Sequence, residues 1–159
     1  MFLQNLRAKV GARLNGDKGE AGFTLIELLV VMLILGILAA IAIPAFFNQR
    51  EKASDAQAKS AARTAETAIE TYATENEGKY DGATPPILHG IESTLVDEAG
   101  EPNVISVAAG LADNEFKVTS TSGSGNNTAF SIERDDEGHV TFFCAPVGAG
   151  CPSTQDWSK

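Results

Sequence analysis

The segment GFTLIELLVVMLILGILAAIAIP, residues 22–44, constrains the fold of this chain more than any other. Sixteen successive residues from Leu28 to Ile43 carry no polar side chain, and the apolar run with its flanks extends from Phe23 to Phe47. A helix needs about 20 apolar residues to cross a bilayer. The run is too long for the apolar core of a secretion signal, and no small-residue cleavage pattern follows it. We therefore predict a membrane-spanning helix over residues 23–47.

Charge is divided unevenly along the chain. Residues 1–22 carry four basic and two acidic side chains, whereas residues 23–159 carry eight basic and nineteen acidic ones, so the net charges are +2 and −11. Because basic residues stay on the cytoplasmic side of a span, we expect the N-terminus inside the cell and the body outside. The acidic body argues against nucleic acid as a main partner, since binding relies on Lys and Arg.

The helix is predicted to continue beyond the membrane. Residues 45–77 are rich in good helix formers, and small or apolar residues recur among them at steps of three and four. The members of this stripe are Ala58, Ala61, Ala62, Ala65, Ala68, Ile69, Tyr72 and Ala73. On the polar side, Asp55 and Lys59 have the spacing of an i,i+4 ion pair.

One helix from about Thr24 to Glu77 would contain two weak points, Gly36 and Pro44. A proline inside a helix removes a backbone donor and clashes with the preceding turn, so we predict a kink near Pro44. Gly78 is expected to be the C-cap.

The chain changes character after residue 78. Pro and Gly residues between positions 79 and 103 indicate a loop, in which we expect a short helix over residues 91–97. Three segments rich in β-formers follow and are joined by short turns: 115–122, 128–135 and 139–146. Such short connections predict an antiparallel meander. Residues 104–111 fit either a further strand or a short helix.

One face of such a sheet must be covered, and the small-residue stripe is the long amphipathic surface available. We therefore predict an α+β fold, in which a long N-terminal helix packs against an antiparallel sheet of three or four strands. Its first half would be transmembrane and kinked near Pro44. The expected divisions are an assembly helix over 23–47, an amphipathic helix of the head over 48–78, and a loop and sheet over 79–159.

Cys144 and Cys151 lie close together near the C-terminus. In an exported chain this pattern predicts one disulfide, here pinning the tail to the last strand. The alternative, two free thiols in a cytosolic protein, conflicts with the predicted span. Trp157 is interpreted as a hydrophobic plug of the tail, with an exposed docking patch as the alternative.

Motifs for catalysis or metal binding are not evident. His89 and His139 are interpreted as surface histidines, and no nucleophile motif or zinc motif accompanies them. The acidic run at residues 135–138 offers oxygen ligands for calcium, but a solvated hairpin turn is the favoured interpretation. We expect neither an enzyme nor a bound metal or cofactor.

The motif Gly-Phe-Thr-Leu-Ile-Glu at residues 22–27, between a basic peptide and a long amphipathic helix, resembles the N-terminus of type IV pilins and the related pseudopilins. The resemblance implies that a prepilin peptidase removes residues 1–22 by cutting after Gly22, and then methylates Phe23. Cutting after Gly19 instead would lose the family spacing to Glu27. The leader departs from the family pattern in its length and in having Glu20 where a basic residue is common.

Glu27 has two interpretations. It either caps the first helical turn or snorkels towards the headgroups, because the helix dipole favours an anion there. The resemblance implies a second role, in which Glu27 pairs with the amine that cleavage exposes on Phe23 of a neighbouring chain and so sets the register of assembly.

The resemblance implies a structural subunit of a type IV pilus, first in the cytoplasmic membrane and then in an extracellular filament. Its partners would be copies of itself, prepilin peptidase, and an assembly platform with a cytoplasmic ATPase, since the chain has no phosphate-binding loop motif. Filaments of this kind serve adhesion, twitching motility or DNA uptake. The alternatives are a pseudopilin of a type II secretion system, a minor pilin, or a membrane-anchored binding protein that does not polymerise.

Overall fold

The computed structural model describes residues 22–108, 113–148 and 150–158, so the predicted leader lies almost entirely outside the described residues. The chain divides between Ile43 and Pro44 into two compact units, which are described separately. Helix α2 (Leu25–Glu75) contains Gly36 and Pro44 and matches the predicted bounds to within two residues at each end. The kink near Pro44 remains a prediction.

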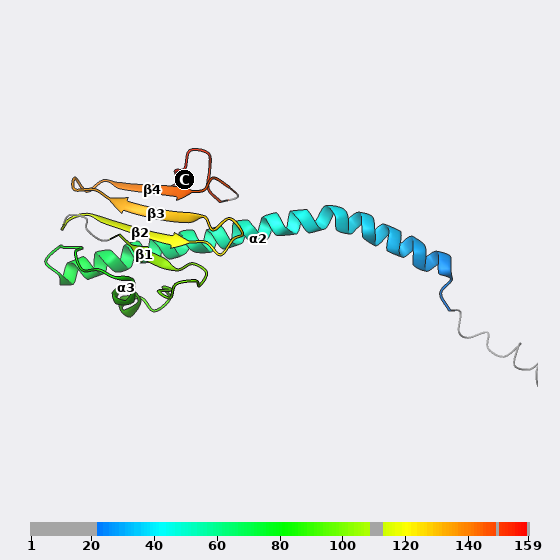
Figure 1. The fold of residues 1–159 in the computed structure, drawn as a ribbon, viewed down its shortest axis with the longest axis horizontal. Helices are drawn as coiled ribbons and strands as arrows, with labels where there is room; N and C mark the ends of the chain where they lie inside the picture. The colour runs from blue at the N-terminus through cyan, green and yellow to red at the C-terminus, as the bar shows by residue number, and fades with distance from the viewer. Residues whose placement is uncertain (1–21, 109–112, 149, 159) are drawn as a thin grey trace, which may run out of the picture. The chain divides into compact units, whose positions relative to one another are not determined.

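The second unit contains a four-stranded sheet covered by the second half of α2 (Figure 1). Every neighbouring pair is antiparallel and the order is β1-β2-β3-β4, which confirms the predicted meander and α+β fold. The strands are β1 (Ile105–Val107), β2 (Phe116–Thr121), β3 (Ala129–Arg134) and β4 (Val140–Ala145). The segment 104–111 therefore contributes a strand in its described part.

The predicted short helix at residues 91–97 is wrong, because the helix lies earlier, in α3 (Pro85–Ile91). Pro85 and Pro86 occupy its first turn. Backbone N–H groups in a first turn have no acceptor within the helix, so the lack of an N–H group in proline costs nothing there. Leu88 is buried, and its carbonyl accepts from the amide of Glu92, which ends the helix.

The small-residue stripe of α2 packs on the sheet as predicted. Its buried members are Ala58, Ala62, Ala65, Ala68, Ile69 and Ala73, and they join a core with Phe116, Val118, Phe130 and Ile132. Ala61 and Tyr72 are partly exposed at its margin. Because alanine side chains are short, they leave room for the larger strand residues, which fill the space between the helix and the sheet.

The predicted pairing of Asp55 with Lys59 is wrong. Asp55 is 1% exposed and forms no ion pair with the described residues. Lys59 Nζ instead lies 5.2 Å from the centre of the Phe130 ring and 6.0 Å from that of Trp157. The aromatic rings at this edge of the sheet attract the ammonium group through their π faces.

The helix ends in a Schellman-type arrangement, in which the amide of Gly78 donates to the carbonyl of Ala73 at 2.8 Å. The residue in the left-handed C′ position is Glu77, with φ 59°, and Gly78 follows it with φ 80°. Gly78 therefore helps to close the helix, but the prediction placed the C-cap too late.

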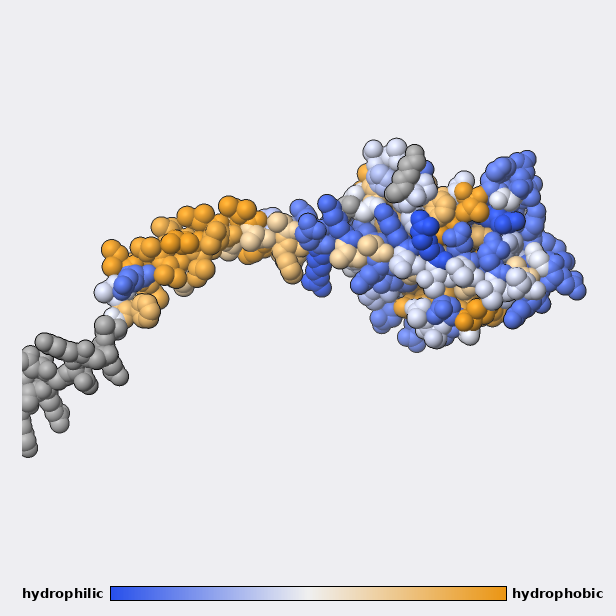
Figure 2. Space-filling view, turned by 180° about the vertical axis from the view of Figure 1, so that it is seen from behind, coloured by the Kyte–Doolittle hydropathy of each residue, from blue (hydrophilic) through white to orange (hydrophobic). Residues whose placement is uncertain are grey.

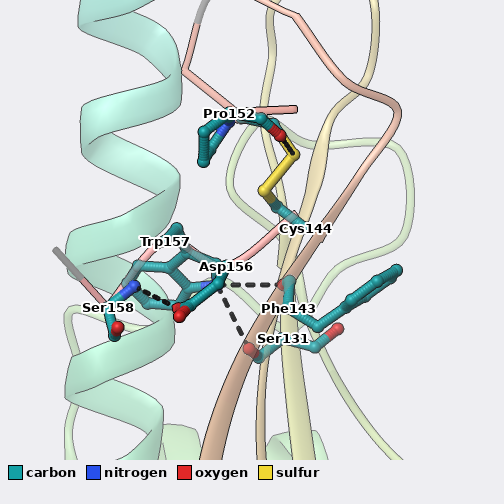
Figure 3. Close-up of a disulfide and its surroundings, with 8 residues drawn as sticks. Ser131, Phe143, Cys144, Pro152, Asp156, Trp157 and Ser158 are labelled. Atoms are coloured by element: carbon teal, nitrogen blue, oxygen red, sulfur yellow. Dashed lines mark hydrogen bonds between the residues drawn. A yellow bond between two sulfur atoms is a disulfide. The ribbon is translucent and has the colours of Figure 1, made fainter. Parts of the chain in front are cut away.

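The C-terminal tail folds against β4 (Figure 3). Cys144 and Cys151 form the predicted disulfide, and the amide of Cys144 donates to the carbonyl of Gln155. Trp157 is 3% exposed, and its Nε1 donates to the carbonyls of Phe143 at 2.9 Å and Ser131 at 3.2 Å. Trp157 is therefore a plug, and its interpretation as an exposed docking patch is wrong.

The disulfide loop contacts α2 closely at Gly150. A Cβ atom at this position would lie 2.4 Å from Cβ of Asp55, whereas at Gly148 it would lie 3.4 Å from the nearest side-chain atom. We expect Gly150→Ala to destabilise the head by about 1–3 kcal/mol, because the added methyl overpacks this contact. Gly148→Ala is the matched control. Thermal unfolding followed by circular dichroism measures both, and equal melting temperatures would contradict the close contact.

Tyr80 ties the region after α2 to the helix and to the sheet. Its hydroxyl donates to Glu70 Oε2 at 2.8 Å, and its ring meets that of Phe116 edge-on. Arg134 Nη1 lies 3.5 Å from Glu70 Oε1. Burial raises the pKa of the Tyr80 phenol, and the hydrogen bond to Glu70 raises it further.

This shift predicts a loss of stability at high pH. The unfolded chain releases the phenolic proton near pH ~10, whereas the folded chain holds it to higher pH. The contribution of Tyr80 is therefore complete below the unfolded pKa and is lost as the pH rises through the folded pKa. Tyr80→Phe should flatten this decline in denaturant unfolding experiments, and Tyr72→Phe should retain it. A decline of the same size in Tyr80→Phe would exclude the phenol as its source.

Candidate functional site

The candidate site is the first turn of α2, where a carboxylate begins an exposed apolar surface. Among the described residues, α2 is the one helix long and apolar enough to cross a membrane. Figure 2 shows apolar residues along this part of the helix. Phe23 is 89% exposed, and Gly22 and Phe23 both precede the helix in irregular backbone.

Thr24 and Glu27 form a reciprocal pair at the helix start. Glu27 Oε2 accepts from the amide of Thr24 at 2.8 Å and from its hydroxyl at 2.7 Å. Thr24 Oγ1 in turn accepts from the amide of Glu27 at 3.2 Å. This is a capping box, which satisfies amide groups that the first turn of a helix leaves without partners.

The capping interpretation of Glu27 therefore holds within a single chain. Thr24 was not predicted as its partner, although the T-x-x-E spacing before an apolar run is the signal of a capping box. Thr24 is thus a functional candidate that the sequence contained and the interpretation missed.

The capping box leaves one carboxylate oxygen for another partner. Glu27 Oε1 accepts no hydrogen bond from the described residues, while Oε2 accepts two. The side chains of Phe23, Ile26, Val30 and Val31 surround Glu27 on an exposed, almost entirely apolar surface. A carboxylate beside such a surface is costly in a dry environment unless a cation pairs with it. The arrangement is therefore suited to receiving a positively charged group.

The acidic run at residues 135–138 closes the β3–β4 hairpin. Asp135 Oδ1 accepts from the amides of Glu137 at 3.1 Å and His139 at 2.7 Å. The pKa of Asp135 lies below its ordinary value, chiefly because the backbone amide of His139 donates to its carboxylate. Other contacts with His139 and the hydrogen bond from the Glu137 amide lower this pKa further. The hairpin interpretation is confirmed, and the described residues contain no group of acidic, histidine or cysteine side chains arranged to hold a metal ion.

The two histidines differ in their surroundings. His139 is exposed beside Asp135 and Glu137. His89 is partly buried, with Nδ1 2.6 Å from the carbonyl oxygen of Leu95, so this ring fastens α3 to the loop that follows it. Neither lies next to a nucleophile in the described contacts.

The family model for the prokaryotic N-terminal methylation motif matches residues 17–43. This chain is 32% identical over 148 residues to the type IV major fimbrial protein FimA of Dichelobacter nodosus, covering 88% of this chain and 82% of that protein. It is 32% identical over 139 residues to the type IV major pilin protein PilE1 of Neisseria gonorrhoeae, spanning 86% of this chain and 61% of that protein.

A weaker similarity joins the chain to a secretion component. The type II secretion system core protein G of Pseudomonas aeruginosa is 34% identical over 83 residues, which cover 52% of this chain and 55% of that protein. No solved structure matches the chain significantly.

Thr24→Val removes the capping hydroxyl and keeps the shape of the side chain. We expect the first turn of α2 to lose about 1 kcal/mol, because Glu27 loses one hydrogen bond and its amide loses an acceptor. Hydrogen exchange at the amides of residues 27 and 28, in detergent-solubilised protein, should become faster. Thr24→Ser keeps the hydroxyl and should exchange like the wild type. Equal exchange in all three proteins would show that the capping box does not stabilise the turn.

Proposed function

Since this chain belongs to the type IV pilin family, we propose that it is a structural subunit of a type IV pilus, processed after Gly22 and polymerised through residues 23–47 of its long helix. The observation that carries the proposal is a long exposed apolar helix surface with one carboxylate, Glu27, in its first turn. Its place before processing is the cytoplasmic membrane, with the N-terminus inside, and its place after assembly is the extracellular filament.

The exposed helix is suited to two successive environments. Leu25, Leu29 and Met32 are each more than half exposed, as are most of the large apolar residues up to Phe47. Soluble proteins rarely leave so continuous an apolar surface in water. Lipid tails and neighbouring helices are similarly apolar, so the helix exchanges one for the other with little change in hydrophobic free energy. The work of extraction therefore falls to an assembly platform and its ATPase.

Glu27 sets the register of assembly in this proposal. Cleavage after Gly22 gives Phe23 a positively charged amine, and a neighbouring helix shifted along the filament axis brings that amine to Glu27. Thr24 holds the carboxylate through Oε2, and Oε1 receives the amine. In an apolar bundle an unpaired charge would be strongly destabilising, so registers that leave Glu27 unpaired are disfavoured.

The similarity to relatives and the disulfide also bear on the three alternative functions. A pseudopilin role is supported by the similarity to core protein G, which covers about half of each chain. The fimbrial relative is aligned over 82% of its length, and the disulfide near the C-terminus accords with the pilin assignment. A minor pilin would share the same helix and processing site. In a membrane-anchored protein that does not polymerise, the carboxylate would serve only the capping box with Thr24, and Oε1 would need no partner from another chain.

Processing is tested at Gly22 and Gly19, the two glycines nearest to the start of the helix. We expect mass spectrometry of purified fibres to find a chain that begins at N-methylated Phe23. Gly22→Leu should leave the full-length chain in the membrane, because the prepilin peptidase of this family cuts after a glycine. Gly19→Ala is the control and should be processed normally. A chain that keeps Met1 in wild-type fibres would contradict the proposed processing.

Assembly is tested by removing the charge of Glu27 without changing its shape. Glu27→Gln should enter the membrane and be cleaved, but the yield of sheared fibres seen by electron microscopy should fall at least about tenfold, since the amine then has no counter-ion. Glu51→Gln, which neutralises a carboxylate outside the apolar run, should assemble normally. Wild-type fibre yield from Glu27→Gln would refute the register role.

A further inference from the structure

The side of the head next to β4 carries a basic stripe, made of Lys52, Lys59 and Arg63. These residues are seven and four positions apart on α2, so they lie along one face of the helix. The side chains of Lys59 and Arg63 lie over the ring of Trp157, which places this face beside the C-terminal tail. Lys52 and Arg63 are exposed, and Lys59 is partly buried.

The basic stripe forms no ion pair with the described residues. Burial raises the pKa of Glu66, and the nearby charge of Arg63 offsets part of that rise. Asp156 lies in the tail, where its backbone pairs with that of Phe143. Because these two carboxylates are outnumbered by the three cations of the stripe, this side of the head has a local excess of positive charge.

The opposite edge of the sheet, at β1, carries an acidic loop over residues 92–101 (Figure 1). The amide of Ile105 in β1 donates to the carbonyl of Val96 at 2.8 Å, so the loop follows the outer edge of this strand. No lysine or arginine occurs between Lys79 and Lys117 in the sequence. The carboxylates of the acidic loop belong to Glu92, Asp97, Glu98 and Glu101.

The four carboxylates differ in their contacts. Glu92 accepts hydrogen bonds from an amide and a hydroxyl of its own loop, and Asp97 Oδ1 lies 3.9 Å from Nδ1 of His89. Glu98 and Glu101 are exposed and form no ion pair with the described residues. Like charges that lie close together repel each other, so a cationic surface would stabilise this loop.

The acidic loop and the basic stripe lie at similar levels along α2. Thr94 and Val96 of the loop border the same hollow as Gln57 and Thr64 of the helix, so the loop lies beside the part of α2 between these two residues. The stripe begins five residues before Gln57 and ends one residue before Thr64. Two copies placed side by side can therefore bring the loop of one against the stripe of the other.

We propose that the acidic loop of one copy docks on the basic stripe of the next copy in the fibre, an inference that rests on the proposed polymerisation. When Phe23 of one chain reaches Glu27 of the next, the two copies are shifted by four residues, or about 6 Å. Because the copies are identical, their heads are shifted by the same amount. The stripe of the chain that supplies the amine then lies level with positions 56–67 of its neighbour, beside that neighbour's acidic loop.

Opposite charges on opposite edges also fix how the heads follow one another. Each head offers the acidic loop to one neighbour and the basic stripe to the other, and this head-to-tail contact continues as an open helical array. A head turned around would bring like charges together. Ion pairs on a surface are individually weak, but a fibre repeats the contact at every subunit.

Cross-linking in sheared fibres tests which surfaces meet. Ala56 is exposed on α2 one turn after Lys52, and Glu98 is exposed in the acidic loop. In the double variant Ala56→Cys/Glu98→Cys, a short bis-maleimide should join neighbouring chains into a ladder on a denaturing gel. Arg50→Cys/Glu98→Cys is the matched control, because Arg50 is exposed on a different face of the same helix. We expect the first pair to give at least about fivefold more linked chain.

Reversal of the loop charges tests whether attraction drives the contact. Glu98→Lys/Glu101→Lys should lower the yield of sheared fibres seen by electron microscopy at least about fivefold, because repulsion replaces attraction at every subunit. Glu75→Lys/Asp136→Lys reverses two exposed charges elsewhere on the head and should assemble normally. Circular dichroism checks that each variant is folded.

The outcomes separate this contact from polymerisation itself. Equal linking of the two cysteine pairs in fibres, or wild-type fibre yield from Glu98→Lys/Glu101→Lys, would overturn the proposed contact and leave the pilus subunit intact. A wild-type chain that makes no fibres would overturn both.

Discussion

Close packing between the alanine stripe of α2 and the antiparallel sheet holds the head together. Ala58, Ala62 and Ala65 are fully buried, and their short side chains let the large residues of β2 and β3 fill the space between helix and sheet. On the same helix, Lys59 and Arg63 lie over the ring of Trp157. Larger residues in the alanine stripe would push the helix away from the sheet. Lys59 and Arg63 would then lie farther from the ring of Trp157.

The elements governed by local periodicity were predictable from the sequence. The helix, its buried stripe and the three longer strands follow from repeats of 3.6 and 2 residues, which depend on neighbours in the chain. Asp55 was assigned to the wrong side because its polarity suggested solvent, whereas its burial depends on a loop almost a hundred residues later, at Gly150. α3 was misplaced because the two prolines were interpreted as loop residues rather than as a helix start.

At the candidate site, too, the features set by neighbouring residues were predictable and those set by distant partners were not. Glu27 was identifiable because a carboxylate in an apolar run is unusual, and its capping role follows from local geometry with Thr24. Its proposed partner, an amine on another chain, is a property of the assembly and leaves no periodic pattern in one sequence. A single residue thus combines a contact within the chain, which the structure describes, with a contact between chains, which the family relationship suggests.

The tail also bears on what a polymer of these heads must avoid. The tail occupies part of the outer edge of β4. There the amide of Cys144 donates to the carbonyl of Gln155, and Trp157 is buried beside it. An open edge strand is a template for further strands, and subunits crowded along a fibre would hold such edges at high local concentration. By covering part of this edge with residues 155–157, the chain limits edge-to-edge strand pairing. Ordered polymerisation and amyloid-like aggregation are thereby kept on different surfaces of the same molecule.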